Sequence, residues 1–369
     1  MKRRLNIAFF GSSLVSAYWN GAATYYRGMV RALFGRGHRV TFFEPDAYER
    51  QRHRDLADPP WAAVVVYPAG DERGVQRALE QARHADVIVK ASGVGIFDEL
   101  LEAAVPAMRR PGTLTVYWDV DAPATLERLE RNPDDPLRAQ IPKYDLVFTY
   151  GGGDPVVERY RRLGARACIP IYNGLDPATH YPVPSDPRFT ADLTFLGNRL
   201  PDREARVESF FLAAAAALPQ HRFLLAGSGW EDKVMPSNVR YIGHLYTRDH
   251  NAFNCTSRAV LNINRDSMAE NGWSPATRVF EAAGAGACLI SDHWRGLEQF
   301  LEPDKEVLVA EQGADVARIL ASLDQSRAAA IGRRARAHIL AHHTYEHRAL
   351  QVEQALLEHH VPPMWVAAS

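Results

Sequence analysis

Short β-branched or aromatic runs alternate with longer helical patterns along almost the whole chain. The expected strands of the first half are 5–10, 39–43, 64–67, 86–90, 113–117 and 146–150. Those of the second half are 193–196, 223–226, 239–242, 259–263 and 287–291. Helical patterns between them cover 21–36, 71–84, 155–163, 203–218 and 275–285, and the stretch 314–360 is almost wholly helical. Such alternation is typical of βαβ units, so the chain is predicted to be an α/β protein with parallel sheets.

The chain has 369 residues, and at about 150 residues per domain two domains are expected. Prolines at 170, 177, 182, 184 and 187 mark a crossing between them. We predict two doubly wound, Rossmann-like domains that face a cleft, with a C-terminal helical tail. The expected bounds are 1–175 for the N-terminal domain and 190–343 for the C-terminal domain. Residues 344–369 are expected to form a helix that packs back toward the N-terminal domain.

Composition and charge exclude several classes of protein. Lys and Arg total 43 against 44 for Asp and Glu, so no global basic field collects nucleic acid, and we expect no nucleic-acid partner. The longest apolar runs fall well short of the roughly 20 residues that span a bilayer. The three cysteines form no CxxC pair, which indicates a reducing compartment and excludes a cysteine-built zinc site. We expect a cytoplasmic enzyme.

Three glycine turns follow expected strands and precede helices. They are the turn at 11–13 that leads to Gly21, the turn that begins at Gly197, and the turn at 227–230 that holds Gly227 and Ser228. Helix N-termini at such turns present N–H groups to anions. Arg199 and Arg203 lie close to the second turn, so the three turns together favour a phosphorylated ligand.

The stretch 271–287 is the richest in polar candidates. We expect Ser274 to be the N-cap of a helix whose first turn holds Pro275. Arg278 and Glu281 are three residues apart and share a face of that helix. They form either a surface ion pair or, if Glu281 lies at a cleft, an acceptor for the hydroxyls of a ribose.

Asp119 and Asp121 form a DxD pattern in the first half of the chain. We favour a role for one of them in accepting a hydrogen bond or proton from an acceptor hydroxyl. The alternatives are a metal site and the capping of the helix that starts near Pro123.

The C-terminal stretch has two further features. Histidines at 338, 342, 343 and 347 include pairs at i and i+4, a spacing that can bind a metal, but a solvated helix face is the preferred interpretation. No metal site is predicted. The stretch 327–343 is basic and partly amphipathic, which leaves open a peripheral contact with a membrane surface.

Several motifs together resemble a known family. In the second half they are Thr194-Phe-Leu-Gly197, Leu224-Leu-Ala-Gly227-Ser-Gly229, Val239-Arg-Tyr-Ile-Gly243, Leu261-Asn-Ile-Asn264, Arg278-Val-Phe-Glu281-Ala-Ala-Gly284-Ala-Gly286, Leu289-Ile-Ser-Asp292, Lys305-Glu306-Val307 and Thr344-Tyr345 with Arg348. In the first half they are Tyr117-Trp-Asp119-Val-Asp121-Ala-Pro123, Tyr144-Asp145-Leu-Val-Phe-Thr149 and Asn173-Gly-Leu-Asp176-Pro. The sequence resembles group-1 glycosyltransferases of the GT-B fold, and most closely their CgeB-like (spore maturation protein) branch.

The resemblance implies a nucleotide-diphosphate sugar, such as a UDP-, GDP- or dTDP-sugar, bound as a substrate by the C-terminal domain. It implies an acceptor on the N-terminal domain and no metal or cofactor. Glu281 matches the glutamate that holds the ribose hydroxyls, and Arg199 matches the contact to the diphosphate. The other positions assigned to the donor are Gly21, Gly197, Arg203, Gly227, Ser228, Gly243, His244, Leu245, Trp273, Ser274, Thr277 and Arg278.

The family pattern is broken at one position. Group-1 enzymes often carry a second glutamate eight residues before the ribose glutamate, and this chain has Trp273 there. Retaining and inverting chemistry therefore both stay open. The alternatives to a sugar transferase are a sugar-nucleotide epimerase on the same fold and a catalytically degenerate protein that binds a nucleotide or glycan. The acceptor, the donor base and the oligomeric state are not predicted.

Overall fold

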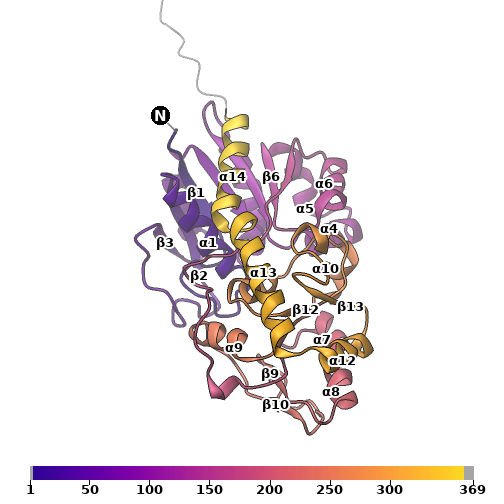
Figure 1. The fold of residues 1–369 in the computed structure, drawn as a ribbon. Helices are drawn as coiled ribbons and strands as arrows, with labels where there is room; N and C mark the ends of the chain where they lie inside the picture. Colours follow the sequence, from indigo (N-terminus) through magenta and orange to yellow (C-terminus); the bar gives the residue numbers. More distant parts are fainter. Residues whose placement is uncertain (1–2, 361–369) are drawn as a thin grey trace, which may run out of the picture. The chain divides into compact units, whose positions relative to one another are not determined.

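The computed structural model describes residues 3–360 and divides the chain into two compact units (Figure 1). Among the described residues, unit 1 comprises 3–172 together with 345–360, and unit 2 comprises 173–344. The last residues of the helix expected over 344–369, from 361 onward, lie outside the described residues.

The described part of unit 1 is built on a seven-stranded parallel sheet in the order β3-β2-β1-β4-β5-β6-β7. The strands are β1 (Asn6–Phe10), β2 (Arg39–Asp46), β3 (Ala63–Pro68), β4 (Val87–Ala91), β5 (Leu114–Asp119), β6 (Leu146–Thr149) and β7 (Cys168–Pro170). Ile7 pairs with Val40 on one side and with Val87 on the other, so the strand order reverses at β1. In doubly wound sheets, ligands bind at the carboxyl ends of the strands near such a reversal.

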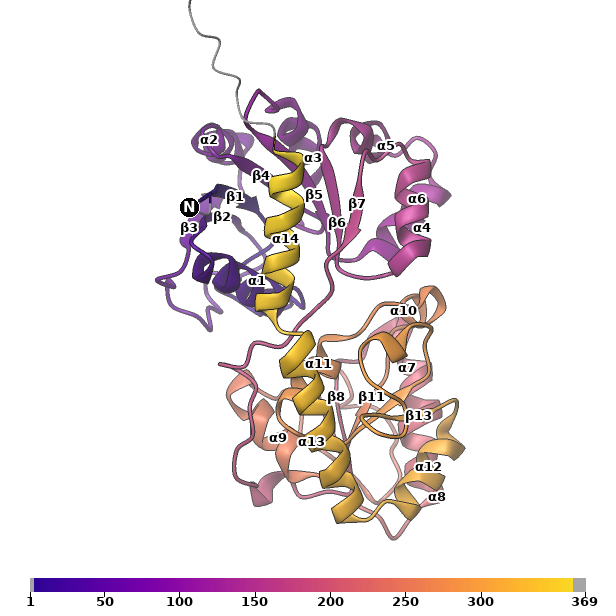
Figure 2. The same ribbon diagram turned by 45° about the horizontal axis from the view of Figure 1, so that its top comes forward.

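Helices cover both faces of this sheet (Figure 2). They are α1 (Ala23–Gly35), α2 (Glu72–Ala82), α3 (Asp98–Ala107), α4 (Ala122–Arg131), α5 (Pro136–Gln140), α6 (Gly153–Arg162) and α14 (Tyr345–His359). The last helix packs on α1, and a Cβ at Gly28 would lie 2.2 Å from the Tyr345 ring. Glu353 is buried and pairs with Arg36 and His38 of the first βα unit. Glycine at 28 thus allows the close approach of α14.

The described part of unit 2 holds a six-stranded parallel sheet in the order β10-β9-β8-β11-β12-β13. The strands are β8 (Leu193–Leu196), β9 (Phe223–Ala226), β10 (Val239–Tyr241), β11 (Ala259–Asn262), β12 (Leu289–Asp292) and β13 (Leu308–Ala310). The helices are α7 (Pro201–Val207), α8 (Ala213–Ala217), α9 (His250–Thr256), α10 (Asp266–Asn271), α11 (Thr277–Gly284), α12 (Gly313–Ser322) and α13 (Gln325–His342).

The strands expected from the sequence are confirmed, and their ends differ from the expected ones by at most three residues. Two short strands, β7 and β13, were not expected; each has three residues and lies at the edge of its sheet, so it leaves little pattern. The helix expected over 203–218 is interrupted by a π-helical turn at Glu208–Leu212.

The amphipathic pattern of α13 is explained by packing. Its apolar residues Ala328, Ile331, Ala335 and Ile339 are buried, and two of them belong to the core of unit 2. The apolar face that suggested a membrane contact is therefore covered by the protein itself. None of the helices in the described range is long and apolar enough to cross a bilayer.

Candidate functional site

The helix α11 begins later than expected. Ser274 is not its N-cap, because α11 starts at Thr277 and is preceded by Ala276, whose methyl group accepts no hydrogen bond. The Ser274 hydroxyl instead donates to the carbonyl of Gly272 at 3.0 Å, a local bond that competes with capping. The first turn of α11 thus keeps N–H groups that an anionic ligand can satisfy.

Glu281 is a buried carboxylate in the middle of α11 and is only 7% exposed. Its Oε2 lies 3.2 Å from Arg278 Nη1, and its Oε1 lies 3.7 Å from His180 Nε2. Burial raises the pKa of Glu281, but His180, Arg278 and His250 lower it more, and the pKa falls below its usual value. The expected Arg278–Glu281 pair exists, and it is buried rather than on the surface.

The turns after β8, β9 and β10 pack against one another. Gly227 has φ +123°, and a Cβ there would lie 2.2 Å from the carbonyl oxygen of Gly197. The Gly227 N–H donates to the Gly243 carbonyl at 2.8 Å. Glycine is therefore required where these backbones meet, and the structure brings together Gly197, Gly227, Ser228 and Gly243 at the carboxyl ends of three neighbouring strands.

Arg199 and Arg203 flank the first of these turns. Arg199 pairs with Glu204 and with Asp232, each at 2.7 Å. The hydrogen bonds that Arg199 donates to these two carboxylates raise the pKa of Arg199 above its usual value. A phosphate that binds Arg199 must therefore compete with two internal partners. Arg203, on α7, comes within 3.0 Å of a Cβ placed at Gly197.

The remaining donor candidates of unit 2 differ in exposure. His244 is exposed and its ring stacks edge-on against Tyr246, whereas Leu245 is buried. Trp273 has a left-handed backbone with φ +44°. Its ring packs on Gly296, where a Cβ would come within 2.1 Å, and beside the Arg295 guanidinium. The Trp273 side chain thus fixes the loop before α11.

A polar cluster at the ends of β11 and β12 was not among the predicted site residues. Asp292 is fully buried and accepts hydrogen bonds from the Asn264 N–H at 2.9 Å and from Arg206 Nη2 at 2.7 Å. Burial raises the pKa of Asp292 above its usual value, although the nearby Arg206 partly opposes this shift. The signal in the sequence is a polar residue directly after an apolar strand, as in Leu261-Asn-Ile-Asn264.

Unit 1 holds Asp119 and Asp121, and their environments differ. Asp119 is fully buried and accepts hydrogen bonds from Ser92 Oγ at 2.8 Å, Asp121 N at 3.0 Å, Thr125 Oγ1 at 3.0 Å and the Tyr160 hydroxyl. Burial raises the pKa of Asp119 above its usual value. Asp121 is half-buried and directly precedes α4. Asp119 therefore anchors this loop, and Asp121 is the better candidate to reach an acceptor.

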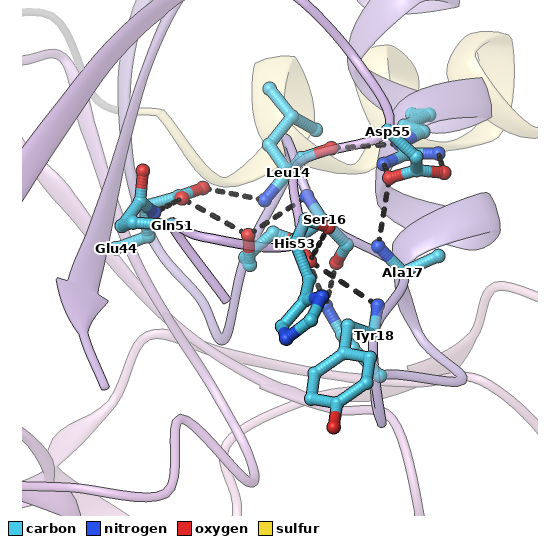
Figure 3. Close-up of polar contacts among 11 residues, drawn as sticks. Leu14, Ser16, Ala17, Tyr18, Glu44, Gln51, His53 and Asp55 are labelled. Atoms are coloured by element: carbon cyan, nitrogen blue, oxygen red, sulfur yellow. Dashed lines mark hydrogen bonds and ion pairs between the residues drawn. The ribbon is translucent and has the colours of Figure 1, made fainter. Parts of the chain in front are cut away.

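The loop after β1, residues 11–20, is held in place by polar side chains of the segment 44–55 (Figure 3). Glu44 is fully buried and accepts from Ser13 Oγ at 3.0 Å and from Leu14 N at 2.6 Å. Asp55 accepts from Ala17 N at 3.0 Å. Gly21, which directly follows this loop, is exposed, and a Cβ there would meet nothing within 4 Å. The loop is thus a fixed platform beside the strand-order reversal of unit 1.

This loop and the segment after β2 display exposed aromatic rings. Trp19 is 68% exposed and Tyr48 is 56% exposed, and both have left-handed backbones, with φ +46° and +55°. Tyr18 stacks on His53 with 4.0 Å between ring centroids. Strained backbone at non-glycine residues is typical of binding sites.

Of the four histidines of the C-terminal stretch, His338 and His342 lie on α13, His343 directly follows it, and His347 lies on α14. His338 and His342 have ring centroids 5.1 Å apart, and His338 Nδ1 lies 3.2 Å from a carboxylate oxygen of Glu306. In the described range, the group of three side chains whose ligand atoms converge is a different one, His180, His250 and Glu281.

Known proteins share this architecture and part of the sequence. Residues 203–354 match a family model described as glycosyl transferase-like. No curated protein matches the sequence. The solved structures that are similar include HepE of Anabaena in complex with UDP and glucose, with a TM-score of 0.67, 16% identity, and 96% of this chain and 100% of that chain covered. The two parallel sheets with their helices are the fold of GT-B glycosyltransferases.

Two further structures match over nearly their whole length. Sucrose-phosphate synthase from Thermosynechococcus elongatus has a TM-score of 0.69 and 16% identity, with 96% of this chain and 99% of that chain covered. An α-glucosyltransferase in complex with UDP-glucose and DNA containing an abasic site has a TM-score of 0.71 and 12% identity, with 96% and 100% covered. At such identities the likeness defines the fold, and the sequence match over 203–354 adds the glycosyltransferase-like family for that segment.

Proposed function

We propose that the protein transfers a hexosyl group from a nucleotide-diphosphate sugar to an acceptor, without an obligatory metal. One observation carries this proposal: Glu281 is a buried, ionised carboxylate on α11, the helix whose first turn is open to an anion. A ribose diol donates two hydrogen bonds, for which a carboxylate is a suitable acceptor. The diphosphate is then expected to lie near the N-terminus of α11.

The reaction breaks the bond between C1 of the sugar and the diphosphate oxygen, so negative charge develops on the leaving group. We expect the N–H groups at Thr277 and Arg278, in the first turn of α11, to stabilise that charge as preorganised dipoles. The glycine turns at 197, 227 and 243 allow a ligand to approach the backbone closely. The complexes of HepE with UDP and with UDP-glucose support a UDP-sugar as the first donor to test.

We assign the acceptor to unit 1, with Asp121 as the residue that accepts the proton or hydrogen bond of its hydroxyl. Membership of the CgeB-like branch and a cytoplasmic location stay predictions.

A panel of nucleotides tests the donor assignment. UDP, GDP, dTDP, CMP and ADP, each with a common sugar conjugate, are added to the full chain with Mg²⁺ or with EDTA. A ligand at about 100 times its dissociation constant stabilises the folded state by about 2.7 kcal/mol. We expect a rise in melting temperature of several degrees for one base, unchanged by EDTA. Product analysis of that donor without an acceptor then separates a transferase from an epimerase.

A flat response to every nucleotide would contradict the donor site on unit 2. Binding of one nucleotide without turnover or slow hydrolysis of its sugar conjugate would favour a degenerate binding protein, which Trp273 in place of a family glutamate also suggests.

Trp19 is predicted to contact the acceptor. With p-nitrophenyl glycosides as probe acceptors, we expect Trp19→Ala to raise the KM of the acceptor about fivefold, since an aromatic ring stacked on a ligand contributes about 1 kcal/mol. The KM of the donor should not change. Phe34→Ala is the matched control, because Phe34 is 47% exposed and lies on α1. Equal acceptor KM values in the wild type and Trp19→Ala would remove this loop from the acceptor site.

A further inference from the structure

His180, His250 and Glu281 converge in unit 2 from three separate segments. Each offers one ligand atom, and these atoms all lie within 4.8 Å of one another. His180 is 4% exposed and Glu281 is 7% exposed. Within the described residues, His180 Nε2 and His250 Nδ1 are buried nitrogens without a hydrogen-bond partner. Buried polar atoms normally have a partner, so we expect this cluster to bind a further group.

The ring of His180 is held by Thr179 and turned toward Glu281. Thr179 Oγ1 lies 3.1 Å from the Asp176 carbonyl oxygen and 3.0 Å from His180 Nδ1. On the other side of the ring, His180 Nε2 lies 3.7 Å from Glu281 Oε1, which is longer than a hydrogen bond. A cation bound between these two atoms could contact both.

His250 presents a second nitrogen to the same place. Its ring bonds the backbone of Leu245, and the atom left without a partner is Nδ1. A proton can bridge His180 and Glu281, but it cannot also satisfy His250. A metal ion can bind all three side chains.

The three segments are fixed to one another. Asn251, beside His250, donates to the Thr179 carbonyl at 2.9 Å and accepts from the Tyr181 N–H at 3.3 Å. On α11, a Cβ at Gly284 would lie 2.3 Å from Leu175 and 3.2 Å from the His180 carbonyl oxygen. The glycine lets α11 approach the segment that carries His180. The ligand atoms are therefore held close before any ion binds.

We propose that His180, His250 and Glu281 form a binding site for a divalent transition-metal ion of the zinc class. Two imidazoles and one carboxylate are the ligand set of open zinc sites, in which the fourth position is left to water or another ligand. Zinc–ligand distances of about 2.0–2.2 Å require only small side-chain movements from the observed cluster. Magnesium is not expected, because it prefers oxygen ligands.

Arg278 limits the affinity of this site. Its guanidinium pairs with Glu281 Oε2 and leaves Oε1 to the ion, but its positive charge opposes a second cation. We therefore expect zinc to bind with a dissociation constant in the micromolar range. An ion on Oε1 occupies the carboxylate that is proposed above to hold the ribose hydroxyls, so zinc and the nucleotide are expected to compete for Glu281. The ion is not assigned a step in sugar transfer.

Calorimetric titration of the full chain with zinc, after EDTA treatment and desalting, tests the site. We expect one saturable site, at least about tenfold weaker in His180→Ala, His250→Ala and Glu281→Gln. His293→Ala is the matched control, since the His293 side chain is 51% exposed and belongs to the same unit. Cobalt(II) absorption spectra report nitrogen ligands directly and should lose intensity in the histidine variants. No nucleotide is added, so the result does not depend on the proposed function.

Two outcomes would overturn the site. One is the lack of saturable zinc binding by the wild type. The other is wild-type affinity in both histidine variants, which would place any bound zinc elsewhere. The melting temperature shows whether each alanine variant folds. Where one does not, His180→Asn or His250→Gln is used in its place, because these substitutions keep a polar side chain of similar size.

Discussion

Replacing Asp119 by alanine is expected to lower the free energy of unfolding by about 3 kcal/mol. The substitution removes the acceptor of hydrogen bonds from Ser92, Thr125, Tyr160 and the Asp121 N–H, all at a fully buried position. Donors left unpaired in the interior cost more than the lost bonds contribute, because they also lose their solvation by water. For a unit of this size the melting temperature should fall by roughly 6–12 °C.

Asp121→Ala is the paired control for that experiment. Asp121 is half-buried and its side chain does not cap α4, so its removal should change the free energy of unfolding by less than about 1 kcal/mol. If Asp121 accepts the proton of the acceptor, the turnover number should fall about a hundredfold or more in this well-folded variant. A stable Asp119→Ala protein would contradict the structural role of Asp119. Full activity in Asp121→Ala would contradict the role of Asp121 in accepting the proton.

Glu281→Gln is expected to weaken nucleotide binding by about 1–3 kcal/mol, or roughly tenfold to a hundredfold. Glutamine keeps the shape of the side chain but removes the charge that strengthens hydrogen bonds to a ribose diol. The change also leaves the buried Arg278 without its counter-charge, so the melting temperature without ligand should fall as well.

The loss of nucleotide affinity must be separated from the loss of stability. Nucleotide affinity is therefore measured by calorimetry at a temperature where both proteins are folded. Glu302→Gln, an exposed change in the same unit, serves as the control. Nucleotide affinity equal to that of the wild type in folded Glu281→Gln would show that this carboxylate does not bind the donor.

Local features of the sequence were enough to predict most of the fold. Buried parallel strands are short apolar runs, and helices follow the 3.6-residue period, so each element leaves its own pattern. The glycine turns were also predictable, since Gly227 needs a backbone conformation that other residues rarely adopt. Ser274 is the exception. Serine is a good N-cap residue, but the Ser274 hydroxyl donates to the carbonyl of Gly272 and does not cap α11.

The environment of each site residue was decided by the tertiary structure alone. Asp119 and Asp121 look equivalent in sequence, and only the packing of β5, α4 and α6 buries one and leaves the other half-exposed. Arg199 looks like a phosphate ligand until Asp232 is brought beside it.

The sequence by itself determined the α/β class, the parallel sheets and the glycine turns, because these depend on neighbours along the chain. The meeting of His180, His250 and Glu281 depends on three segments far apart in sequence. Burial and electrostatic coupling are set by distances through space, which only the packed structure defines.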